Sequence, residues 1–119
     1  MQKVILNAVV ATTTSDGVNV ENLTHLSFQL VASAISAGNG AFAIQGSNDG
    51  TNWTALAVID NLANAITEGL TRITSKTVSA NGAVFVFLDD FMKTKVIRVV
   101  LTRTTDGTFS CIMMADKIA

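Results

Sequence analysis

The sequence predicts an all-β protein, an antiparallel β-sandwich of jelly-roll type with about eight strands. Apolar and polar residues alternate with a period of two over most of the chain, and β-branched residues are frequent in the alternating segments. Clusters of Gly, Asn and Asp separate these segments, and no proline interrupts them. The length of 119 residues is that of one ordinary domain, so we expect a single sandwich domain over residues 1–119.

The alternation also gives the position of each strand. We expect strands at residues 3–10, 26–31, 42–45, 53–58, 72–78, 84–88, 95–103 and 109–114, with a short extended piece at 18–20. Residues 60–70 break the alternation, because their apolar residues are three and four positions apart. A short helix and an irregular crossover fit that segment equally well.

The connections contain residues that favour tight turns. The strongest cluster lies at 46–52, where Gly46, Asp49 and Gly50 supply the conformations that a tight loop needs. Trp53 begins the strand that follows, so the segment predicts a hairpin. Residues 36–40 predict a flexible turn, and the pair at 81–82, Asn-Gly, predicts a hairpin-type turn.

The strand at 84–88 is apolar on both of its faces. Val84, Val86 and Leu88 point to one side, and Phe85 and Phe87 point to the other. Such a strand is either central in its sheet or covered by a partner. Only 14% of the residues are charged, against about a quarter in a typical domain. Phe85 and Phe87 are therefore the candidate interface residues.

Residues that could carry chemistry are few and scattered. The single histidine, His25, is expected in a turn or at a sheet edge, and the single cysteine, Cys111, is expected as a buried thiol. Asp89 and Asp90 are the only adjacent carboxylates, and neighbours on a strand point to opposite faces. The sequence therefore predicts no enzyme, no cofactor and no metal site.

Composition also limits the partners. The eight basic residues are spread along the chain and the net charge is −1, so we expect no nucleic-acid partner. The longest apolar run is far too short to span a membrane, and no secretion signal is evident, which indicates synthesis in the cytoplasm. Trp53, beside a loop, is either a sugar-stacking residue or a core residue, and its place at the start of a strand favours the core.

Two segments resemble a known architecture. Residues 42–56, FAIQGSNDGTNWTAL, resemble the strand–loop–strand segment of discoidin-like jelly-roll domains, and residues 95–102, KVIRVVLT, resemble a later strand of those domains. The first segment is also similar to one in small β-sandwich proteins of tailed bacteriophages. The chain departs from sugar-binding discoidin domains, because it has no Tyr, one Trp and no cysteine pair.

The resemblance to the phage proteins implies a virion structural protein, most simply a capsid decoration (cement) protein on the capsid surface. Its partners would be the major capsid protein or other virion proteins, and closed symmetry at coat-subunit junctions favours a homo-oligomer, a trimer above all. A carbohydrate-binding module for host attachment and a tail or neck component are the alternatives.

Overall fold

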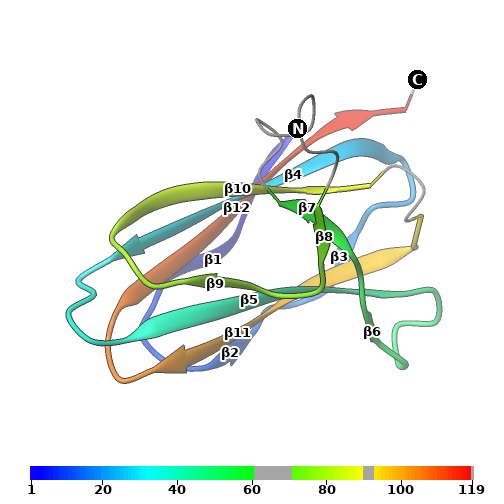
Figure 1. Ribbon diagram of the computed structural model, residues 1–119. Coiled ribbons are helices and arrows are strands. Elements are labelled where there is room, and N and C mark those ends of the chain that lie inside the picture. Colours follow the sequence, from blue (N-terminus) through cyan, green and yellow to red (C-terminus); the bar gives the residue numbers. More distant parts are fainter. Residues whose placement is uncertain (61–70, 90–92, 119) are drawn as a thin grey trace.

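The computed structural model describes residues 1–60, 71–89 and 93–118, and within them it is an antiparallel β-sandwich (Figure 1). We call the two layers sheet A and sheet B. Sheet A contains, in order, β1 (Gln2–Val9), β12 (Thr108–Lys117), β4 (Leu23–Ser33), β10 (Gly82–Leu88), β7 (Val58–Asp60) and β8 (Thr71–Ile73). Sheet B contains β2 (Thr13–Thr14), β11 (Val96–Thr104), β5 (Asn39–Ser47) and β6 (Thr54–Ala55), while β3 (Val18–Asn19) also pairs with β11 and β9 (Lys76–Val78) with β5.

The expected fold class is confirmed, but the number of strands is larger than expected. The described residues form twelve strands, and half of these are only two or three residues long. Such short ladders contain too little alternation to be recognised from sequence. The expectation of a helix or crossover at 60–70 concerns residues that, apart from Asp60, lie outside the described part of the chain. Among the described residues, no helix is long and apolar enough to cross a membrane.

Alternating side chains of the long strands build one core between the sheets. Sheet A contributes Phe28, Phe109 and Met113, and sheet B contributes Phe42 and Leu101, among other fully buried residues. Phe42 and Phe109 meet edge to face across the core, with ring centroids 6.0 Å apart and an interplanar angle of 72°. This is a favourable arrangement for two aromatic rings, and it links the two sheets directly.

Strand β10 occupies a central position, between β4 and β7. Val86 and Leu88 are buried in the core, as the alternation predicted, and the opposite positions Phe85 and Phe87 face away from it. Of the two explanations for an apolar strand, the central position is therefore confirmed. It does not account for the outward-facing phenylalanines.

Two expected connections are wrong in detail. Residues 72–78 do not form one strand, because β8 lies in sheet A and β9 in sheet B. The Asn-Gly pair at 81–82 makes no hairpin either, since it joins β9 to β10 in the opposite sheet. There the Asn81 side-chain oxygen accepts a hydrogen bond of 2.9 Å from the backbone N–H of Ile35. Asn81 thus holds two connections together at one end of the sandwich.

The connection at 36–40 was expected to be flexible, but hydrogen bonds to a carboxylate hold it in place. Asp106 accepts hydrogen bonds from the backbone N–H groups of Ser36, Ala37 and Gly38, at 3.1, 3.1 and 2.8 Å. The bonds from Ala37 and Ser36 are the largest causes that hold the pKa of Asp106 below its usual value. The stabilisation is therefore complete above the unfolded pKa, near 3.8, and is lost as the pH falls through the folded pKa.

Candidate binding surface

The outer face of sheet A is the candidate binding surface, and strand register shows which residues form it. One row across the strands contains Val4, Ile112, Gln29 and Phe85, and the next contains Gln2, Met114, Ser27, Phe87 and Ile59. A third row contains Ser110, Val31 and Ala83. None of these residues is charged.

Large apolar side chains stand exposed on this surface. Phe85 is 49% exposed, Met114 53% and Val4 51%. Phe85 and Phe87, two residues apart on β10, stack with centroids 6.2 Å apart and an interplanar angle of 16°. Contiguous exposed apolar side chains of this kind mark interaction sites more often than isolated ones do. The two sequence-selected interface residues therefore lie together on one outer face.

A hollow lies beside this aromatic pair. It has a volume of about 290 Å³, and its walls come from β1, β4, β10 and β12: Gln2, Ser27, Gln29, Phe85, Ile112 and Met114. Periodicity alone indicated Phe85 and Phe87 but missed the neighbours on β1 and β12, because those strands are far away in sequence. Met114 and Val4 would have been found only from the strand order.

The loop at 46–52 is organised around a second carboxylate. Asp49 Oδ1 accepts hydrogen bonds from the backbone N–H groups of Thr51 and Asn52, both at 2.8 Å, and from the Ser47 hydroxyl at 2.9 Å. The Asn52 side-chain amide donates to Oδ2 at 2.7 Å. Hydrogen bonds from Asn52, then from Thr51 and Ser47, hold the pKa of Asp49 far below its usual value. All of these donors belong to the loop itself, so Asp49 acts here as a turn-forming residue.

Two glycines permit this loop. Gly50 has φ +77°, a conformation that favours glycine. Gly46 lies at the end of β5, where a Cβ atom would come within 2.6 Å of the Thr94 side chain and 2.9 Å of Leu56. Strands β5 and β6 pair across the loop, from Gln45 to Ala55 and from Gly46 to Thr54, so the expected hairpin is confirmed. The expected return strand at 53–58 is wrong in length, because β6 ends at Ala55 and Val58 begins β7 in sheet A.

Trp53 does not fill the core, and that expectation is wrong. Its side chain is half-buried and lies outside the cluster of residues packed between the sheets. The Arg98 guanidinium carbon lies 4.3 Å from the centroid of the Trp53 ring, and Arg98 also donates to the Gln45 side-chain oxygen at 2.8 Å. The ring therefore makes a cation–π contact on the outer side of sheet B. Because Arg98 already occupies one ring face, that face cannot stack on a sugar.

Replacing Trp53 with Ala is expected to lower the free energy of unfolding by about 1–2 kcal/mol, less than the loss of a fully buried aromatic residue. The reason is that Trp53 lies outside the core, so its removal leaves a depression open to water instead of a closed cavity, together with the loss of one cation–π contact. Urea unfolding of Trp53→Ala, of Arg98→Leu and of the double variant checks this prediction. The double variant should show less than the sum of the two effects, and additive effects would contradict the contact.

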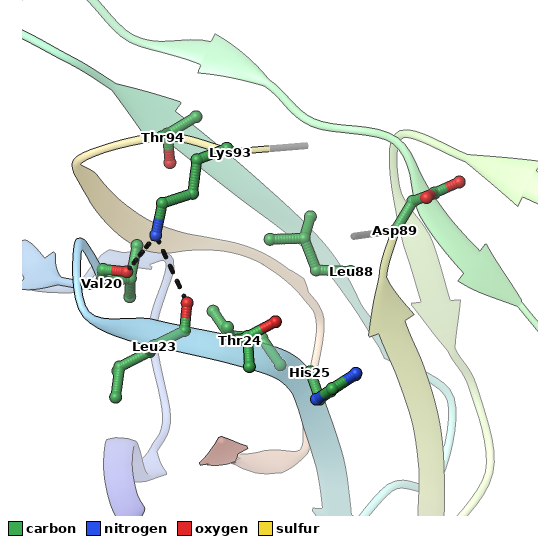
Figure 2. A pocket seen from close by; sticks show the side chains of 9 residues that line it. Val20, Leu23, Thr24, His25, Leu88, Asp89, Lys93 and Thr94 are labelled. Atoms are coloured by element: carbon green, nitrogen blue, oxygen red, sulfur yellow. Dashed lines mark hydrogen bonds between the residues drawn. The ribbon is translucent and has the colours of Figure 1, made fainter. Parts of the chain in front are cut away.

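A smaller cavity lies at the end of the sandwich where the β3–β4 connection meets Lys93 (Figure 2). The Lys93 ammonium donates to the carbonyl oxygens of Val20, Glu21 and Leu23 at 2.9, 2.6 and 3.4 Å. The cavity measures about 40 Å³, room for about one or two water molecules and too little for a substrate. Lys93 therefore stabilises a backbone turn through these hydrogen bonds.

The residues considered for catalysis are not assembled into a reactive site. Cys111 is fully buried, as expected, and burial raises the pKa of its thiol to about 12, which keeps it protonated. His25 lies at a bulge within β4, rather than in a turn or edge strand, with Nδ1 3.2 Å from an oxygen of Asp116. Within the described residues, no three His, Cys, Asp or Glu side chains gather as a metal site would require.

Comparison with known proteins identifies a shared fold. No protein-family model matches the sequence, and no curated protein matches it either. The structure is similar to the crystal structure of the SPBc2 prophage-derived protein YomS, with a TM-score of 0.69. The similarity covers 98% of this chain and 92% of that chain at 10% sequence identity. The two proteins therefore have the same sandwich over almost their whole length.

Proposed function

We propose that this chain is a non-catalytic structural protein of a bacteriophage virion, most simply a decoration protein that stabilises the capsid at coat-subunit junctions. The observation that carries the proposal is the uncharged outer face of sheet A, with its stacked Phe85 and Phe87. Exposed apolar surface of this kind gains stability when another protein covers it. The fold shared with a prophage-derived protein supports the phage assignment.

The mechanism would be passive burial of surface. A decoration protein binds at many equivalent sites, so modest contacts add through multivalency. The protonated Cys111 thiol and the hydrogen-bonded carboxylates of Asp49 and Asp106 serve the fold and support a non-catalytic role. The carbohydrate-binding alternative is weakened, since Arg98 covers one face of the only tryptophan.

The test is to follow the protein in purified particles. Virions that carry it should contain it at a fixed ratio to the major coat protein, and it should sediment with isolated heads rather than with tails. Heads assembled without it should bind the purified protein until saturation and should then resist heat better. Recovery with tails would move the assignment to a tail or neck component. Absence from every virion fraction would overturn the proposal.

A further inference from the structure

We infer that the outer face of sheet A is a homotypic interface, on which two copies of this chain pack face to face about a two-fold axis. The inference rests on the proposed function, and it names a second copy as the protein that covers this surface, so that contacts with the coat protein would use the remaining faces of the pair. Three properties of this face support a second copy as its occupant: its charge, its shape and its area.

The charge distribution permits the face to meet itself. All three rows are neutral. Charged side chains border them at Arg72 on β8, which is paired with Asp89 at 2.7 Å, and at Asp116, two residues beyond Met114 on β12, whose carboxylate lies 3.2 Å from His25 Nδ1. Within the three rows, two copies therefore bring no like charges together, a condition that a self-complementary interface must satisfy. Gln2 and Gln29 carry amides that both donate and accept hydrogen bonds, so each can pair with its own equivalent.

The shape of the face is also self-complementary. Phe85 projects from β10, and the hollow of about 290 Å³ lies directly beside it, bounded by Gln29, Ile112 and Met114. In a two-fold pair, a residue of one copy contacts a site on the second, and the reverse contact follows by symmetry. Phe85 of each copy would enter the hollow of the other. Both halves of this contact are present on one chain.

The area is sufficient for a stable pair. Sheets pack about 10 Å apart, strands lie about 4.8 Å apart, and each residue extends a strand by about 3.3 Å. Four strands, β1, β12, β4 and β10, outline roughly 19 by 23 Å over the length of β10, and the three residues of β7 bring the face to about 490 Å² on each copy. Two copies would bury about 1,000 Å², which is close to the smallest area that a specific interface requires.

The β1 edge of sheet A is less suited to assembly. Within the described residues, β1 pairs only with β12, but its register shifts twice, and Ala8 has a φ of 51°. Bulges and the exposed Lys3 are features that prevent a second chain from adding to an edge. A trimer, which virion symmetry favours, would need two different complementary patches, whereas this face meets a copy of itself. The geometry therefore points to a pair.

The experiment is to measure the mass of the purified protein in solution across a range of concentrations, by light scattering or sedimentation. We expect the measured mass to equal that of two copies of the chain. Phe85→Asp should weaken self-association by roughly thirtyfold or more, as loss of a central interface residue does. Thr102→Asp is the matched control, because Thr102 is exposed on β11 in the other sheet. It should leave the mass unchanged.

Circular dichroism and thermal melting show whether Phe85→Asp still folds, and Gln29→Lys provides a second charge on the same face if it does not. A monomeric or trimeric parent protein overturns the inference, as does a folded Phe85→Asp that remains a pair. Other results would contradict the proposed function without contradicting the pairing. A pair that is absent from virions contradicts the virion role alone, and a monomer that binds heads contradicts the pairing alone.

Discussion

Replacing Phe109 with Ala is expected to lower the free energy of unfolding by about 3–5 kcal/mol. Phe109 is fully buried in β12 and packs edge to face on Phe42 of sheet B, so its ring joins the two sheets. It also covers two glycines: a Cβ atom at Gly40 or Gly107 would come within 2.7 Å of the ring. Truncation would therefore leave a cavity that the neighbouring backbone is unable to fill.

Urea unfolding of Phe109→Ala measures this effect, and Phe85→Ala, studied as the monomer, is the matched control. Phe85 is half-exposed, so its truncation should cost less than about 1.5 kcal/mol. A double-mutant cycle with Phe42→Ala should reveal a coupling of about 0.5–1.5 kcal/mol between the rings. Equal losses from the Phe109 and Phe85 variants would contradict the core assignment.

The long strands were predictable because each has one face buried in the core. Along β10 and β11, burial of alternate side chains produces the period of two that the sequence displays. The same alternation places Phe85 and Phe87 on the face opposite to Val86. These positions depend on strand geometry alone, and so the pattern is enough to assign them.

Features that depend on strand order could not be predicted in the same way. Val4 and Met114 join Phe85 on one face only because β1, β12, β4 and β10 are neighbours in sheet A. Trp53 was misplaced because it precedes a two-residue strand, where no alternation indicates a direction. The pair at 81–82 was assigned to a hairpin because a local turn signal does not reveal whether the next strand is in the same sheet.

The role of Asp106 was hidden for a related reason. The sequence indicated a turn at 36–40, and residues 105–108 also contain residues that favour turns, but nothing in either segment links it to the other. The contact between these two connections follows from the strand order, because β4 pairs with β12 and β5 with β11, which brings both connections to one end of the sandwich. One carboxylate then satisfies three backbone donors of the other connection.

This association leads to the second large effect, which is expected at Gly38. A Cβ atom there would lie 2.2 Å from the carbonyl oxygen of Thr104 and 2.4 Å from the backbone nitrogen of Asp106. Both contacts are with backbone, which cannot move aside as a flexible side chain can. Gly38→Ala would therefore push the 36–38 connection away from the Asp106 carboxylate and weaken the hydrogen bonds between them.

We expect Gly38→Ala to lower the free energy of unfolding by about 3 kcal/mol or more, from steric overlap together with weakened charge-assisted hydrogen bonds. Gly50→Ala is the matched control, because Gly50 has a φ of +77° but no atom within 4 Å of its Cβ position. That variant carries backbone strain alone and should lose about 1 kcal/mol. Urea midpoints of the two variants separate these costs. If Gly38→Ala costs no more than Gly50→Ala, the close approach of the two connections does not constrain the fold.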